Sequence, residues 1–313
     1  MKVIVTGSAG YVASHLAPLM QQKAAVHGVD QSFSKYTDIQ SKIESIEFKN
    51  HLKRFNDKEL TIVNLAAARF DFGVAAKDYY RLNVECHHKF LKSLINHKVK
   101  KFVHISSVAA LDGRHIFYSD ELNCDDAYRA TKYLQEVIIQ KWCDERDIEL
   151  TILYPSAIFS DDLRSDTNIG KLLSISKFIP FIPKINVVKS LTYLPNFSRF
   201  IVDTVVGEIP SGKYITIEKP SLTVSEMIQV VSGRNIQLIH IPFFQLILKL
   251  AAKFLYALGI FGKIDLKLTP NRVVKLFSDT SYSKINYKDI DSTTYADRNI
   301  VQLSQILSNF NGK

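Results

Sequence analysis

The amino-terminal segment 3-VIVTGSAGYVA-13 restricts the fold of this chain more than any other stretch. Its residues 3 to 5 are an apolar run short enough for a buried parallel strand. Gly7 permits a sharp turn after the strand, and Gly10 permits a ligand to approach the backbone closely where a helix is expected to begin. A strand, a glycine turn and a helix in this order predict the first unit of a doubly wound α/β sheet.

The helix expected near Gly10 directs its amide N–H groups and the positive end of its dipole at the turn, which suits an anion such as a pyrophosphate. The residues expected to contact it are Gly7, Ala9, Gly10, Tyr11 and Val12. Ordinary strand–turn–helix connections also use helpful glycines, so the turn alone does not decide between a binding site and a structural turn.

Asp30 ends the next strand-like run, 26–29, at the position where a carboxylate accepts hydrogen bonds from the hydroxyls of an adenosine ribose. A carboxylate repels a 2′-phosphate, so the sequence favours NAD over NADP as the cofactor. Lys35, which is close in sequence, weakens that preference. The alternative for Asp30 is a surface turn residue of the kind common at strand ends.

Up to about residue 160, strand-like runs alternate with helix-like segments. The strand-like runs are 3–5, 26–29, 46–49, 60–68, 102–111 and 150–158, and apolar residues at helical spacing mark 78–98 and 126–146. This alternation predicts right-handed crossovers and an α/β fold with a Rossmann-type doubly wound parallel sheet. We expect residues 1–160 to form the NAD-binding domain, with 191–206 returning to it. Residues 161–313 are expected to form mainly a smaller substrate-binding α/β region.

The net charge of +9 indicates an attraction to anions. The basic residues are scattered, with only short clusters such as 98–101, so we expect no nucleic-acid partner. Three cysteines without metal-like spacing argue against a disulfide framework and against a metal site. The cysteine content and the lack of a cleavable-signal pattern after Met1 predict a cytoplasmic protein.

The segment 241–262 is long and apolar, but Lys249 and Lys253 interrupt it. Its uncharged stretches are shorter than the about 20 residues that cross a bilayer. One hypothesis is a helix packed against the substrate-binding side. The other is an interfacial helix whose lysines meet acidic headgroups, which predicts peripheral membrane contact.

Tyr128 and Lys132 lie one turn apart in a predicted helix, so their side chains share a face. Of the 14 tyrosines, only Tyr128 has a lysine four residues on. The ammonium is expected to lower the pKa of the phenol toward neutrality and to bind the nicotinamide ribose. The phenol then takes a proton from a substrate hydroxyl while a hydride leaves the same carbon. The alternative is an exposed pair on an amphipathic helix.

Two serines end the strand that precedes this helix, at the edge of the sheet where doubly wound folds bind ligands. We expect Ser107 to hold the substrate hydroxyl or carbonyl near Tyr128, and Ser106 is the alternative. Neither serine lies in a G-x-S-x-G elbow, so a nucleophilic role is not indicated.

The ordered set of motifs resembles the extended short-chain dehydrogenase/reductases, and within them the nucleotide-sugar epimerase/dehydratase family. The matching segments are 6-TGSAGYVA-13, 29-VD-30, 64-NLAAA-68, 82-LNV-84, 105-ISS-107, 128-YRATK-132 and 154-YPSAIF-159. The chain departs from the family pattern at Ala13, where glycine is usual, and at Tyr154, where the family has arginine.

The resemblance implies NAD bound along the first sheet. The further residues expected to line the cofactor are Ala66, Ala67, Tyr154 and Pro155. Asn83 is implied to support the active-site helix, and Arg272 to meet the diphosphate of the substrate. The catalytic triad maps to Ser107, Tyr128 and Lys132, and the family leads us to expect a homodimer.

From the motifs and the resemblance we expect an NAD-dependent epimerase or 4-keto reductase that acts on a nucleotide-activated sugar. A 3β-hydroxysteroid dehydrogenase or another alcohol dehydrogenase would use the same triad, and the apolar later chain suits a lipid-like substrate. The alternative of another class is a non-catalytic dinucleotide-binding scaffold, against which the pair of Tyr128 and Lys132 argues.

Overall fold

The computed structural model describes residues 1–68, 75–111, 124–160, 181–218, 221–232, 237–262 and 277. The described residues belong to two units. The first is built from Met1–Ile158 and Thr192–Thr216, and the second from Phe159–Leu191 and Ile217–Ile285. The expected division into folding domains stays a prediction, and each unit is described by itself.

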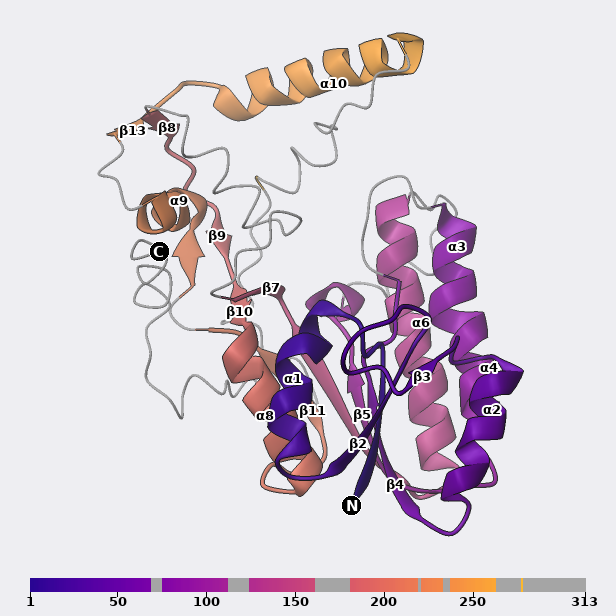
Figure 1. The fold of residues 1–313 in the computed structure, drawn as a ribbon. Coiled ribbons are helices and arrows are strands. Elements are labelled where there is room, and N and C mark those ends of the chain that lie inside the picture. The colour runs from indigo at the N-terminus through magenta and orange to yellow at the C-terminus, as the bar shows by residue number, and fades with distance from the viewer. Residues whose placement is uncertain are drawn as a thin grey trace. The chain divides into compact units, whose positions relative to one another are not determined.

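A seven-stranded sheet forms the centre of the first unit, in the order β11-β6-β5-β4-β1-β2-β3 (Figure 1). The strands are β1 (Lys2–Thr6), β2 (Ala25–Asp30), β3 (Ile39–Gln40), β4 (Glu59–Asn64), β5 (Lys98–Ile105), β6 (Glu149–Pro155) and β11 (Lys213–Thr216). All neighbouring strands run parallel. The strand order reverses between β1 and β4, so the predicted doubly wound Rossmann-type sheet is confirmed. The carboxyl ends of these two strands are where such a sheet binds its ligand.

Helices cover both faces of this sheet, as Figure 1 shows. The helices α1 (Tyr11–Gln21) and α8 (Leu194–Val206) pack together on one face. The other face carries α2 (Ile46–Leu52), α4 (Cys86–Ser93) and α6 (Cys124–Asp144). The short helices η1 (Lys53–Phe55), α3 (Ala76–Tyr80) and η2 (Arg81–Glu85), the last a π-helix, lie in the connections.

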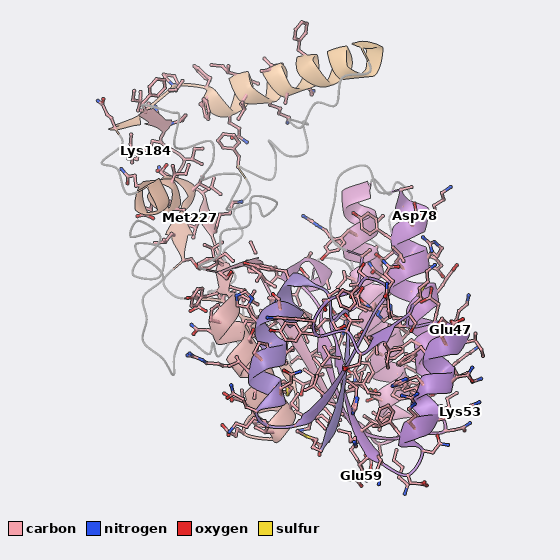
Figure 2. The ribbon with its side chains drawn as sticks, in the orientation of Figure 1. Glu47, Lys53, Glu59, Asp78, Lys184 and Met227 are labelled. Carbon is pink, nitrogen blue, oxygen red and sulfur yellow. The ribbon has the colours of Figure 1, made fainter. Side chains whose placement is uncertain are left out.

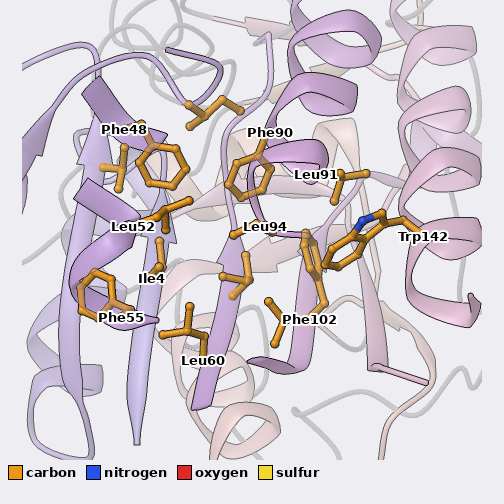
Figure 3. Close-up of a cluster of buried hydrophobic side chains, with 14 of the residues drawn as sticks. Ile4, Phe48, Leu52, Phe55, Leu60, Phe90, Leu91, Leu94, Phe102 and Trp142 are labelled. Carbon is orange, nitrogen blue, oxygen red and sulfur yellow. The ribbon is translucent and has the colours of Figure 1, made fainter. Parts of the chain in front are cut away.

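Two clusters of buried apolar side chains hold these helices on the sheet. Figure 3 shows the first, to which α2 contributes Phe48, α4 contributes Phe90 and α6 contributes Trp142. The second contains Leu16 of α1 and Phe197 of α8. Burying one such side chain stabilises a fold by about 1.5–3 kcal/mol. The clusters therefore fix the helices, and with them the loops at the carboxyl ends of the strands.

The prediction of a strand-like run at 46–49 is wrong, because these residues open α2. Ser45 caps this helix, since its Oγ accepts a hydrogen bond from Phe48 N at 3.2 Å. Phe48 and Leu52 lie one turn apart and are both fully buried. The local cap and the spacing of these two side chains give a helix where the short apolar run indicated a strand.

The second unit combines short strands and two helices. Its strand pairs are β8 (Phe181–Pro183) with β13 (Gln237–Ile239), and β9 (Val188–Lys189) with β12 (Leu222–Thr223). Strand β7 (Ala157–Phe159) pairs with β10 (Leu191–Tyr193), and two of the three residues of each strand belong to the first unit. The helices are α9 (Val224–Ser232) and α10 (Phe244–Gly262). A small cluster of Ile185, Val224 and Ile228 forms a core, against which Phe244 and Phe277 pack. Among the described residues, no helix has the length and apolarity needed to cross a bilayer.

Candidate active site

The turn after β1 has the geometry of a phosphate-binding loop. Gly7 has a φ of +75°, a left-handed conformation that favours glycine, and its N–H donates to Val29 O at 2.8 Å. A Cβ at Gly7 would lie 3.0 Å from Ala66 N, so a side chain would push against the loop that follows β4. The turn and Ala66 therefore meet at the carboxyl ends of β1 and β4.

Helix α1 begins at this turn without a side-chain cap. Gly10 is its N-cap residue and offers no side-chain acceptor to the first-turn N–H groups. A Cβ on Gly10 would lie 3.0 Å from Gly7 O, which keeps the position small. A backbone cradle of this kind fits the pyrophosphate of a dinucleotide, and Ala9, Tyr11 and Val12 lie within it or directly after it.

Asp30 lies at the end of β2 and holds the turn. Its Oδ2 accepts a hydrogen bond from Ala9 N at 3.1 Å, and its Oδ1 accepts one from Ser32 N at 2.8 Å. The carboxylate is thus a turn residue, and each oxygen also has a second lone pair for a ribose hydroxyl. The predicted ribose contact and the alternative of a structural role do not exclude each other.

Tyr128, on α6, and Ser107, after β5, share a side-chain hydrogen bond. Ser107 Oγ also accepts a hydrogen bond from Ala109 N at 3.2 Å, which orients the hydroxyl. The ring of Tyr79 packs edge-on against Tyr128, with ring centroids 5.7 Å apart. The structure thus brings together two of the three residues expected in the triad.

The predicted lowering of the Tyr128 pKa is not found in this structure. Burial raises the pKa of Tyr128 to about 12, and the hydrogen bond with Ser107 lowers it by a smaller amount. Tyr79 adds to the upward shift. Burial has the larger effect because removing the phenolate from water costs more free energy than one hydrogen bond from a hydroxyl contributes. The phenol is therefore protonated at neutral pH.

Lys132 is buried, with only 2% of its surface exposed, which excludes the alternative of an exposed pair on the helix. Its Nζ donates hydrogen bonds to Ile105 O at 3.2 Å and to Gln135 Oε1 at 2.7 Å. Burial lowers the pKa of Lys132, and the nearby Glu136 acts in the opposite direction. Ile105 O and Gln135 Oε1 therefore hold the Lys132 ammonium one helical turn after Tyr128.

Gln135 extends this set of contacts to the next helix. Its Nε2 donates to Ala66 O at 3.3 Å and lies 2.7 Å from His87 Nε2. Burial lowers the pKa of His87 to about 4, so the ring is neutral. Because His87 Nδ1 lies 3.0 Å from Leu82 O, we assign the proton to Nδ1, which leaves Nε2 to accept from Gln135.

Glu136 is a residue of the site that the sequence analysis missed. Ser106 Oγ donates to its Oε1, and Tyr154 OH donates to its Oε2 at 3.0 Å. Burial raises the pKa of Glu136, and these two hydrogen bonds lower it by less. Since Ser106 is engaged by Glu136, Ser107 is the serine that faces Tyr128. In the sequence, the spacing of Tyr128, Lys132 and Glu136 at i, i+4 and i+8 indicates that Glu136 lies on the same helix face as the other two.

Asn83 lies in the π-helix η2 and joins two parts of the site. Its Oδ1 accepts from Ala68 N at 2.7 Å, and its Nδ2 donates to Thr131 Oγ1 at 3.1 Å. It therefore ties the loop after β4 to α6, and its role in supporting the active-site helix stays a prediction.

The remaining predicted residues fall into three groups. Ala66 and Ala67 follow β4, beside the glycine turn. Tyr154 and Pro155 end β6, but the Tyr154 side chain is buried against Glu136. Arg272 lies outside the described residues. The part of the chain that the structure describes contains no group of three or more side chains suited to a metal ion.

All described parts of the site belong to the first unit and gather at the carboxyl ends of its strands. Figure 2 places Glu59, which begins β4, at the opposite end of the sheet from these loops, whereas Asp78 of α3 lies toward the site end. The site thus joins the glycine turn, the carboxylate of Asp30 and the hydrogen-bonded Tyr128 along one edge.

Comparisons with known proteins agree with this fold. A family model described as the NAD dependent epimerase/dehydratase family matches residues 3–193. The chain resembles the structure of UDP-glucuronic acid 4-epimerase from Bacillus cereus in complex with NAD at a TM-score of 0.60 and 18% identity, covering 77% of this chain and 87% of that one. No curated protein sequence matches the chain.

Two further solved structures have the same fold. UDP-N-acetylglucosamine 4-epimerase from Bacillus cereus matches at a TM-score of 0.60 and 16% identity, over 76% of this chain and 84% of that one. A putative epimerase from Burkholderia cenocepacia J2315 matches at a TM-score of 0.62 and 12% identity, over 100% of this chain and 98% of that one. At these identities the likeness concerns the fold.

Proposed function

Because the chain belongs to the NAD-dependent epimerase/dehydratase family, we propose that it is an NAD-dependent 4-epimerase of a nucleotide-activated sugar. The observation that carries the proposal is the hydrogen-bonded pair of Ser107 and Tyr128, with Lys132 buried one turn further along the helix. This pair lies in the same unit as the glycine turn and Asp30. Solved structures of similar fold include 4-epimerases of UDP-sugars, which supports the sugar as substrate.

In this function the glycine turn and the first turn of α1 hold the pyrophosphate of NAD, and Asp30 binds the adenosine ribose. When bound, NAD accepts a hydride from the sugar carbon and later returns it. The residues fit this group, because Gly7 makes the turn and Gly10 leaves the first-turn N–H groups of α1 without a side-chain acceptor. Lys132 is the residue proposed to bind the nicotinamide ribose.

The proton steps fall to Tyr128 and Ser107. Ser107 Oγ holds the C4 oxygen of the sugar, and Tyr128 Oη takes the hydroxyl proton as the carbon is oxidised to a ketone. Tyr128 then returns the proton to the same oxygen when hydride adds to the other face. The protonated phenol described above is ready for the returning step, whereas proton removal needs the phenolate, which burial of Tyr128 disfavours.

The test is incubation of the purified protein with NAD and a panel of UDP-, GDP- and dTDP-sugars, followed by separation of the products. A change of configuration without net consumption of cofactor supports the epimerase. Stoichiometric oxidation of added NADH would make the protein a 4-keto reductase. Binding of NAD without any reaction of a sugar would favour a steroid or other alcohol dehydrogenase, and failure to bind NAD would favour the scaffold.

Replacing Asp30 with Ala is expected to weaken NAD binding by about 10- to 100-fold, because a charge-assisted hydrogen bond is lost. It should also reduce the preference for NAD over NADP, because the carboxylate no longer repels a 2′-phosphate. Isothermal titration with both cofactors measures both effects.

Two further variants separate the roles of Asp30. Asp30→Asn keeps an acceptor for Ala9 N and removes the charge, so it should change the cofactor preference more than the stability of the turn. Asp57→Ala removes an exposed carboxylate elsewhere and serves as the control. An unchanged preference in both Asp30 variants would leave this residue with only its turn role.

A homodimer and a cytoplasmic location remain proposals. The dimer is expected from the family, and light scattering of the purified protein at several concentrations tests it. A single mass equal to the monomer at every concentration would contradict it.

A further inference from the structure

Helix α10 presents an exposed apolar face. The outer apolar face, as we name it, consists of Phe243, Leu246, Ile247, Leu250 and Phe254, with exposed fractions between 54% and 78%. Leu246, Ile247, Leu250 and Phe254 lie at i, i+1, i+4 and i+8 of α10, so they form one stripe along the helix axis, and Phe243 directly precedes the helix. Apolar side chains on this helix are thus exposed where a helix of a globular protein usually carries polar ones.

The helix is attached to its own unit through a different strip. Ala252 is fully buried, and Phe244 packs against Phe277 with ring centroids 5.9 Å apart. Phe244 and Ala252 are eight positions apart and lie on the same side of α10. Ala252 lies on the side of the helix opposite the stripe. Figure 2 shows side chains along both sides of α10. Helix α10 therefore packs on its own unit through a narrow strip, and its outer apolar face stays exposed to solvent.

Phe243, directly before α10, has an unusual backbone conformation. It has a φ of +56°, one of two positive values among the described residues other than glycine, and 78% of its surface is exposed. A left-handed conformation is unfavourable for a residue that has a Cβ. The backbone accepts this conformation directly before α10, where it directs the chain into the helix with the Phe243 ring exposed.

The charged residues of α10 and of the sequence that flanks it have one sign. Lys249 and Lys253 are exposed and lie one turn apart, beside the stripe. The sequence from Met227 to Ile264 contains four basic residues, counting Arg and Lys, and no Asp or Glu. A surface that combines apolar and aromatic side chains with flanking lysines complements a bilayer whose headgroups are anionic.

We propose that the outer apolar face of α10, with Lys249 and Lys253, docks on the surface of a membrane that contains anionic lipids. The apolar side chains enter the boundary between headgroups and acyl chains, and the lysine stems extend so that their ammonium groups reach the headgroup phosphates. A second copy of the chain is the less suitable occupant, because pairing two such faces brings lysines of like charge together. The proposal does not depend on the sugar substrate.

Sedimentation of the full-length protein with vesicles tests the proposal. We expect binding to vesicles of phosphatidylcholine with 30% phosphatidylglycerol, and little binding to pure phosphatidylcholine. Lys249→Gln with Lys253→Gln should weaken binding roughly 20- to 30-fold. Leu250→Ser with Phe254→Ser should weaken it by at least about tenfold, and 0.5 M NaCl should act like the lysine change.

Matched controls separate this face from general stickiness. Phe33 has a similar exposed fraction, 79%, in the first unit, so Phe33→Ser should leave vesicle binding unchanged. Lys23→Gln with Lys58→Gln removes two exposed lysines from that unit and should also have no effect. Unaltered thermal unfolding of each variant confirms that these surface changes leave the fold intact.

Three results would overturn the proposal. They are no binding to either kind of vesicle, equal loss of binding in the control variants, and a dimer that Leu250→Ser with Phe254→Ser converts to a monomer. The last result would assign the face to a second copy of the chain. Because vesicle binding is measured without substrate or cofactor, a failure here is distinct from a failure of the proposed enzymatic function.

Discussion

Replacing Tyr128 with Phe is expected to lower kcat by roughly 10²- to 10⁴-fold, the range that general acid–base catalysis contributes. The change removes the hydroxyl that bonds Ser107 and keeps the ring that packs against Tyr79. The cofactor cradle around Gly7 and Asp30 is built from other elements. Turnover with the reactive sugar should therefore fall steeply, while NAD binding by titration stays within a few-fold of the original.

Tyr133→Phe is the matched control, because it makes the same change five residues further along α6. It should keep most of the turnover, so a loss shared by both variants would point to a disturbed helix. Near-normal turnover of Tyr128→Phe would sink the catalytic assignment. The pH profile adds a second readout, because a phenol with a raised pKa makes the step that removes the proton faster as pH rises.

The parts of the site that depend on neighbouring residues could be predicted from the sequence. The turn at Gly7 follows a buried strand directly, and the positive φ it requires is a property of that one residue. The shared face of Tyr128 and Lys132 follows from helical spacing alone. For the same reason the order of strands and helices in the first 160 residues predicted the doubly wound sheet.

The role of Glu136 could not be predicted in this way, because its partners come from distant parts of the chain. Ser106 is 30 residues away on the loop after β5, and Tyr154 is 18 residues away on β6. Only the parallel pairing of β5 and β6 brings these hydroxyls to one carboxyl group. Tyr154 occupies the position at which the family pattern has an arginine, and in this structure its hydroxyl donates a hydrogen bond to Glu136.

The pKa of Tyr128 is a second case in which tertiary structure prevails over local pattern. Spacing along the helix indicated a lysine that would favour the phenolate, but Lys132 donates to Ile105 O and Gln135 Oε1. Burial of both side chains then acts against charge on each of them, raising the pKa of the phenol and lowering that of the ammonium. How deeply a side chain is buried depends on the packing of the whole unit, so it cannot be predicted from the spacing of residues along one helix.

Replacing Gly28 with Ala is expected to destabilise the first unit by about 3 kcal/mol, the upper part of the usual range for overpacking. A Cβ at Gly28 would lie 1.8 Å from Tyr36 O and 2.8 Å from Ser8 Cβ. The backbone at Tyr36 is held close to β2, because Asp38 Oδ2 accepts from Gly28 N at 2.7 Å and Asp38 N donates to Gly28 O at 2.9 Å. Neither the strand nor this loop can move without breaking these bonds.

Thermal unfolding measures the effect, which corresponds to a fall in Tm of roughly 6 to 12 °C for a unit of this size. Gly212→Ala is the matched control, because the nearest heavy atom to its added Cβ, on the Tyr214 ring, is 3.5 Å away, an ordinary contact. Cofactor binding should fall along with stability only for Gly28→Ala, since Ser8 belongs to the turn that is proposed to hold the pyrophosphate. Equal Tm values for the two variants would contradict the close approach of the Tyr36 backbone to β2.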